Sequence, residues 1–144
     1  MAVSLSSMRA NTRRENDGDW IDIPDLPGVR LKVRGAGYGP YQMAKSIVEG
    51  RWARRYGQDP VPVETALAEN GRLYAEHILL GWEGFDEDYT EEAARHFLTD
   101  PGFRQLHEHI RYAMERVAKT EVAFVEDAAK NSPRSSDGGS TEGA

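Results

Sequence analysis

The chain has 144 residues, the length of a single domain, and 39% of them are hydrophobic, which predicts a modest core with loose ends. The absence of cysteine excludes disulfide bonds, thiolate nucleophiles and cysteine-ligated zinc. Residues 1–60 hold 10 Lys and Arg against 7 Asp and Glu, whereas residues 61–144 hold 8 against 17, for a net charge of −6. This acidic balance argues against a protein whose main task is to bind nucleic acid.

The N-terminal part predicts an arm followed by a hairpin. Residues 1–17 are polar and lack periodicity, so we expect a flexible arm without a signal peptide. From Asp19, "DWIDIP" and "VRLKVRG" alternate apolar and polar residues around the turn signal "DLPG". The pattern predicts a β-hairpin over residues 19–34, and one of its faces must pack on other elements because an isolated hairpin is marginal in water.

The next segments predict two helices after "GAGYGP", which we interpret as a flexible joint. In "YQMAKSIVEGRWARRYG" apolar residues recur at spacings of three and four, with Ile47 widening the stripe, and Gly57 is a suitable end. The second helix begins after the prolines of "DPVPV" and is weakened by Gly71. The predicted bounds are residues 40–56 and 62–80.

Two further helices are predicted on either side of "TDP". Thr90 is a good N-cap for "EEAARHFL", and Asp100 can cap the last helix, with Pro101 in its first turn. The apolar stripe of that helix runs from Phe103 to Ala128. These helices span residues 90–99 and 101–130.

Together the elements predict a mainly α (α+β) fold, in which an N-terminal β-hairpin precedes about four helices. We expect one domain over residues 18–130 and a disordered tail over residues 131–144, "NSPRSSDGGSTEGA". No apolar run approaches the roughly 20 residues needed to cross a bilayer, so no membrane contact is expected.

None of the candidate catalytic, nucleotide-binding or metal-binding motifs matches its required pattern. "GAGYG" has Pro40 where a dinucleotide-binding loop needs its third glycine, and "DEDYTEE" lacks the glycine and the final glutamate of a calcium loop. Glu92 and His96 share a helix face but are too few ligands for a metal site. No serine lies in a G-x-S-x-G turn. We therefore expect a protein that is not an enzyme and has no cofactor or metal.

Two aromatic groups remain as candidates for partner binding. "RWARRY" holds Arg51, Trp52, Arg54 and Arg55, and either contacts nucleic acid or ends a helix, where cations favour the carbonyl dipole; we favour the helix end. "LLGWEGFDEDYT" holds Trp82 and Phe85, which are either core anchors at a corner or an exposed pair offered to a client helix. The core reading is favoured because large aromatic residues are mostly buried. Gly81 and Gly84 are predicted to end one helix and turn the chain.

One family resembles this order of motifs. A "GWEGF" corner, a "YTEEAARHFL" helix and "DPGFRQLHEHI" opening a long helix are similar to the tail assembly chaperones of long-tailed bacteriophages. The resemblance covers residues 19–131 and includes the opening "DGDWIDIPDLPGVRLKVR". It implies a non-catalytic protein of the host cell cytoplasm, which binds the tape measure protein and tail tube subunits and is absent from the finished particle.

Two other functions stay open at this stage. The chain suits a structural neck or tail accessory protein that is retained in the virion, because such a protein is also small, bears a hairpin and lacks cysteine. It also suits a small helical regulator that binds nucleic acid through the arginines of "RWARRY", although the acidic balance disfavours this. A homo-oligomer is left open.

Overall fold

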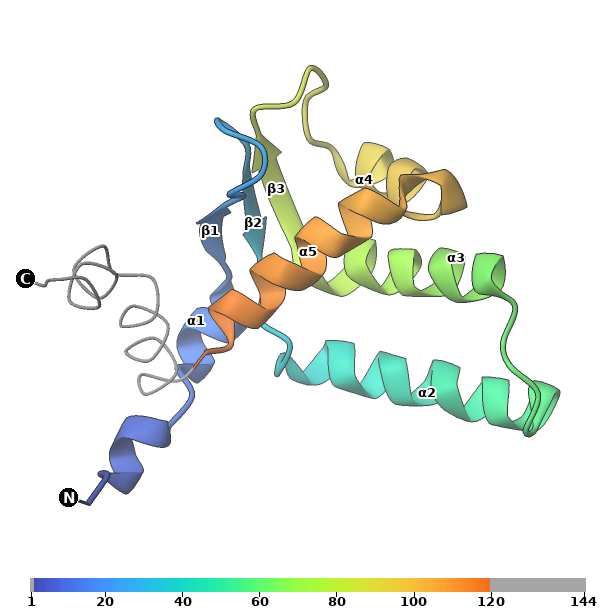
Figure 1. Ribbon diagram of the computed structural model, residues 1–144, viewed down its shortest axis with the longest axis horizontal. Helices are drawn as coiled ribbons and strands as arrows, with labels where there is room; N and C mark the ends of the chain where they lie inside the picture. The colour runs from blue at the N-terminus through green and yellow to red at the C-terminus, as the bar shows by residue number, and fades with distance from the viewer. Residues whose placement is uncertain (1, 120–144) are drawn as a thin grey trace, which may run out of the picture. The chain divides into compact units, whose positions relative to one another are not determined.

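The computed structural model describes residues 2–119, which fall into two compact units. The described part of one unit is residues 2–11 with Lys119, and it includes a 3-10 turn at Leu5–Met8. The other unit is Thr12–Ala118 and contains the sheet and all the α-helices of the described residues (Figure 1). No helix within residues 2–119 is long and apolar enough to span a membrane.

A three-stranded antiparallel sheet forms in the order β1-β2-β3. Strands β1 (Asp19–Asp22) and β2 (Arg30–Val33) are the predicted hairpin, which is confirmed. Strand β3 (Leu79–Glu83) pairs with the free edge of β2, with Trp82 opposite Leu31. The helix predicted over residues 62–80 is therefore wrong at its C-terminal end. The same correction applies to Gly81, which lies inside β3 rather than ending a helix.

Helix α5 (Arg104–Val117) packs against β1 and β2 of this sheet, and the predicted mainly α (α+β) fold is confirmed. The short helix α1 makes the prediction of a flexible arm over residues 1–17 wrong at its C-terminal part. The last helix ends at Val117, where Ala118 forms the C-cap, so the helix predicted over residues 101–130 is wrong at Ala118 and Lys119. Residues 120–130 of that prediction, like the predicted tail over 131–144, lie outside the described residues. The helices are α1 (Thr12–Asp17), α2 (Gly39–Tyr56), α3 (Val63–Leu73) continued by a π-helix (Tyr74–Ile78), α4 (Glu91–Leu98), and α5 (Arg104–Val117) preceded by a 3-10 turn (Pro101–Phe103).

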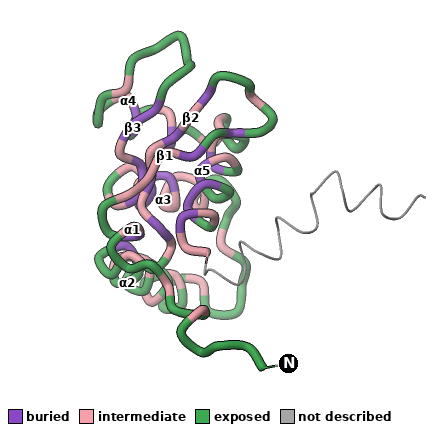
Figure 2. Tube along the Cα trace, turned by 90° about the vertical axis from the view of Figure 1, so that its left-hand side faces the viewer, coloured by how far each residue is buried: buried purple, intermediate pink, exposed green. Residues whose placement is uncertain are grey.

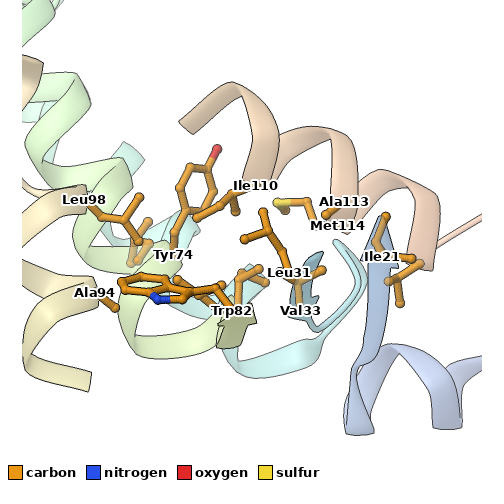
Figure 3. Packing of buried hydrophobic residues seen from close by; sticks show 14 of the residues in the cluster. Ile21, Leu31, Val33, Tyr74, Trp82, Ala94, Leu98, Ile110, Ala113 and Met114 are labelled. Carbon is orange, nitrogen blue, oxygen red and sulfur yellow. The ribbon is translucent and has the colours of Figure 1, made fainter. Parts of the chain in front are cut away.

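Part of the core lies between the sheet and helix α5. Burial alternates along β2, where Leu31 and Val33 are buried and their neighbours are partly exposed, so one face of the hairpin is apolar (Figure 2). Figure 3 shows Ile110, Ala113 and Met114 of α5 facing Ile21, Leu31 and Val33 of the sheet. This packing covers the hairpin face, which an isolated hairpin would leave in water.

The glycine-rich segment between β2 and α2 is packed, not a flexible joint. The Glu15 carboxylate accepts a hydrogen bond from the Gly37 amide at 2.8 Å, and the Glu15 carbonyl accepts one from the Gly35 amide at 3.0 Å. A Cβ atom on Gly35 would lie 2.6 Å from the Glu15 side chain. The glycines therefore make room for a buried carboxylate, and that carboxylate holds α1 against the start of α2.

Helices α3 and α4 approach each other closely at Gly71. A Cβ atom there would lie 1.7 Å from the carbonyl oxygen of Leu98. The same oxygen accepts a hydrogen bond from Nε2 of His107 at 2.8 Å. His107 is 2% exposed, and burial lowers the pKa of its imidazole, which favours the neutral ring. Gly71, predicted only to weaken its helix, is thus a packing position.

Candidate partner-binding groove

The chain leaves the sheet through a sharp turn at Gly84. This glycine has a φ of 94°, in the left-handed region that side chains disfavour, and a Cβ atom on it would lie 2.2 Å from the carbonyl oxygen of Gly28. The turn is thus wedged against the tip of the β1-β2 hairpin. The prediction that Gly84 turns the chain is confirmed.

Trp82 holds the loop after this turn against the core. Its indole Nε1 donates a hydrogen bond to the Glu87 carbonyl at 2.7 Å. Its ring meets Phe85 edge-on at 5.7 Å and Tyr89 edge-on at 5.2 Å between centroids. The Tyr89 hydroxyl donates to the Leu79 carbonyl at 3.3 Å, and burial raises the pKa of that hydroxyl, so it stays a neutral donor. The loop is therefore folded back on β3 and well defined.

The two aromatic residues of the predicted corner differ in exposure. Trp82 is 8% exposed and belongs to the core, where Figure 3 shows it beside Ala94 of α4. Phe85 is 37% exposed. The core reading of the corner thus fits Trp82, whereas Phe85 offers apolar surface to water; whether either contacts a partner stays a prediction.

Phe85 forms one edge of an apolar groove of about 230 Å³. The Phe97 ring of α4 lies 6.5 Å from Trp82 and 5.0 Å from the Phe103 ring, so the aromatic contacts continue from β3 across α4 to the start of α5. The lining residues are Trp82, Phe85, Asp86, Glu87, Phe97, Phe103 and Leu106. The groove therefore has an aromatic floor and an acidic side.

The acidic side belongs to a longer run of negative charge. Residues 83–92, "EGFDEDYTEE", contain six Asp and Glu and no Lys or Arg. Glu83 pairs with Arg30 at 3.3 Å, but Asp86 and Glu87 have no ion-pair partner among residues 2–119. The mouth of the groove thus carries uncompensated negative charge, which attracts cationic groups.

Helix capping fixes the wall that α4 contributes. The Thr90 hydroxyl accepts a hydrogen bond from the Ala93 amide at 2.9 Å, as predicted, and Glu91 and Glu92 occupy the first turn. Asp100 likewise accepts from the Gly102 amide at 2.9 Å, which confirms the second predicted cap. The Thr90 cap sets where α4 begins, and the Asp100 cap sets where the 3-10 turn that contains Phe103 begins.

The basic candidates lie elsewhere, at the C-terminal end of α2. Trp52 is partly buried against the core, and the guanidinium of Arg55 lies 5.5 Å from the Tyr56 ring. Arg51 pairs with Glu69 at 3.2 Å, while Arg54 and Arg55 lie in the last turn of the helix. This arrangement agrees with the helix-end reading, and none of the four residues lines the groove. A partner at Arg51, Trp52, Arg54 or Arg55 stays a prediction.

The ion pair of Arg51 opens a chain of charges across three helical segments. Glu69 also pairs with Arg72 at 2.9 Å, and the hydrogen bond from Arg72 lowers the pKa of Glu69. Arg72 pairs in turn with Glu76, which pairs with Arg95 of α4 at 3.0 Å. The side chains of Arg51, Glu69, Arg72, Glu76 and Arg95 are therefore all held by ion pairs within the fold.

The structure corrects the predicted face of α2 and adds residues to the groove. Ile47, predicted to widen the buried stripe of α2, is 61% exposed, so that prediction is wrong, and Met43 one turn earlier is exposed as well. Phe103 and Leu106 fall in the predicted stripe of the last helix and Phe97 falls in the helix predicted over residues 90–99, and neither prediction links these residues to Trp82. Their spacing signals a buried helix face but not which aromatic groups meet. No cluster of three or more His, Cys, Asp or Glu suited to a metal occurs in the described part of the chain.

Comparison with known proteins identifies the family of this chain. A family model described as YdaY prophage protein matches residues 36–131, about two thirds of the chain. The matched region contains α2 to α5 and strand β3, and so every residue that lines the groove. Neither the curated proteins nor the solved structures contain a match.

Proposed function

The chain belongs to the YdaY prophage protein family, and from this premise we propose that it is a non-catalytic chaperone of phage tail assembly. In this role it binds the tape measure protein and the tail tube subunits in the host cell cytoplasm and is not kept in the particle. The phage origin of the family agrees with the resemblance of the "GWEGF" corner and the helices after it to tail assembly chaperones.

One structural observation carries the proposal: an open apolar groove beside the half-exposed Phe85. An exposed aromatic ring beside an apolar groove is a surface on which a protein can cover an apolar helix of a client. The negative charge around the groove keeps the loaded chaperone soluble. The groove is also formed by a capped helix and a loop tied to Trp82, so it is in place before a client arrives.

Co-expression with the tape measure protein of the same prophage tests the proposal. We expect the tagged chain to co-purify with the tape measure protein and to raise the fraction of that protein found in the soluble lysate. An unrelated acidic protein of similar size serves as control, because it separates specific binding from a general effect of charge. Neither complex nor gain in solubility would contradict the proposed function.

A structural protein of the neck or tail is the second candidate, since the family match specifies phage origin and not a stage of assembly. Mass spectrometry of purified particles separates the two functions. A chaperone is absent from the particles, whereas a retained component is found there in a fixed ratio to the other tail proteins.

A further inference from the structure

We propose that the groove beside Phe85 receives one amphipathic helix of the client, whose apolar anchor residues are flanked by Lys or Arg. The inference rests on the proposed function for the existence of a client, but it assigns the chemistry of the bound segment from the groove alone.

The size of the groove limits the anchors. A closed apolar cavity of about 150 Å³ binds one benzene molecule. At about 230 Å³ the groove therefore takes one aromatic side chain or two aliphatic ones. Two leucines that are three or four positions apart on a helix lie side by side and match this volume, as in other complexes where a helix enters a groove.

The lining of the groove favours a helical occupant over an extended one. An extended segment needs backbone hydrogen-bond partners, which a sheet edge provides. Five of the seven lining residues are apolar or aromatic, so the groove offers few groups that could pair with a bare backbone. A helix satisfies its own backbone and buries only its apolar face.

Charge selects the flanking residues. Asp86 and Glu87 line the groove, and Asp88, Glu91 and Glu92 follow within the same acidic run. Lys or Arg one turn from the anchors would lie near these carboxylates, whereas Asp or Glu would be repelled. The apolar segment of this chain beyond α5, "TEVAFVEDAAK", carries three acidic residues against one lysine, so its charge does not complement the groove.

Peptide binding to the full chain tests the inference by isothermal titration calorimetry. The probe is an alanine-based helix of about 18 residues, with leucine at positions i, i+4 and i+7 and lysine on the flanks; shorter helices are marginal in water. A matched peptide carries glutamate in place of each lysine. We expect the lysine peptide to bind at least about tenfold more tightly at low salt, and the difference to shrink as salt is added.

Two variants connect binding to the groove. Phe85→Ala removes one wall, and we expect it to weaken binding of the lysine peptide about tenfold or more, as removal of a central aromatic residue does in other interfaces. Asp86→Asn with Glu87→Gln keeps the shape and removes two charges, and should weaken binding about fivefold at low salt only. Asp59→Asn with Glu115→Gln makes the same change of charge away from the lining residues, and should leave affinity unchanged.

The outcomes separate the inference from the proposed function. Equal affinity for both peptides, no binding of either, or full affinity in both groove variants would overturn the inference. If the wild-type chain and Phe85→Ala both still co-purify with the tape measure protein, the function stands and the groove is not its site. A concentration-dependent oligomer that Phe85→Ala dissociates would overturn the inference too, since it assigns the groove to a second copy of the chain.

Discussion

Replacing Gly71 with alanine should destabilise the fold strongly, although alanine is the better helix former. The added Cβ atom would lie 1.7 Å from the carbonyl oxygen of Leu98, whereas ordinary contact begins at 3.4 Å, so α3 and the end of α4 must move apart by about the difference. That movement also strains the hydrogen bond from His107 to Leu98, which is 2.8 Å long and buried.

Three contributions give the size of the effect. Alanine stabilises a helix interior by about 1 kcal/mol relative to glycine. Forcing a methyl group into a packed interior costs about 1–3 kcal/mol, and leaving the buried His107 nitrogen without its acceptor costs about 1–3 kcal/mol. We therefore expect Gly71→Ala to lower the free energy of unfolding by about 3 kcal/mol and the melting temperature by roughly 10 °C.

Gly50→Ala is the matched control. Gly50 lies inside α2, and a Cβ atom on it meets only the Arg54 side chain at 3.8 Å, so the helix propensity acts without a clash. It should raise stability by a few tenths to about 1 kcal/mol. Urea unfolding followed by circular dichroism measures both variants. If Gly71→Ala is as stable as Gly50→Ala, the close approach of α3 and α4 is not as described.

Three further predictions concern stability. Thr90→Ala removes the acceptor at the start of α4 and should cost about 1 kcal/mol in urea unfolding, whereas Thr90→Ser should keep most of it. Burial lowers the pKa of His107 below the 6.5 of an unfolded chain, so the unfolded state binds the proton more readily. The free energy of unfolding should therefore fall as the pH drops below about 6.5. In thermal melts, His107→Gln should lack this part of the pH dependence. Glu15→Ala leaves the Gly37 amide without its acceptor and should cost about 2 kcal/mol, with hydrogen exchange rising first at that amide.

The sequence predicts an element well where local pattern and tertiary packing agree. The hairpin alternates apolar and polar residues around a proline-glycine turn, and its register follows from that pattern. The caps at Thr90 and Asp100 are also local, because the donor lies two or three residues from the acceptor. Both features were readable without knowledge of the fold.

Helix α1 and strand β3 were not readable, for different reasons. "TRREND" has no apolar residue, and its buried Glu15 accepts from Gly37 at a separation of 22 residues, which no local signal encodes. "ILLGW" is a run without polar side chains that suits a buried helix end or a buried strand equally. The free edge of β2 decides between them, because pairing there satisfies backbone groups of both strands.

The missed strand also explains why only part of the groove was found. Trp82 and Phe85 stand out in the sequence as aromatic residues beside glycine. Placing Phe97 and Phe103 opposite Trp82 requires the direction of β3 and the turn at Gly84, and both depend on pairing with β2 and contact with its hairpin. The sequence thus identifies single candidate residues, whereas which of them meet in the groove depends on the fold.

Trp82 belongs both to the core and to the groove, and this determines which substitutions can test the groove. Its ring is buried opposite Leu31, its N–H fixes the loop through Glu87, and its surface forms part of the groove. Truncating Trp82 removes core packing worth about 3–5 kcal/mol together with part of the groove, so a loss of client binding would not show which of the two mattered. Phe85 shares the groove but leaves 37% of its surface in water, and its truncation changes the groove more than the core. The same connection makes the groove rigid, because any movement of its floor would disturb the pairing of β2 with β3.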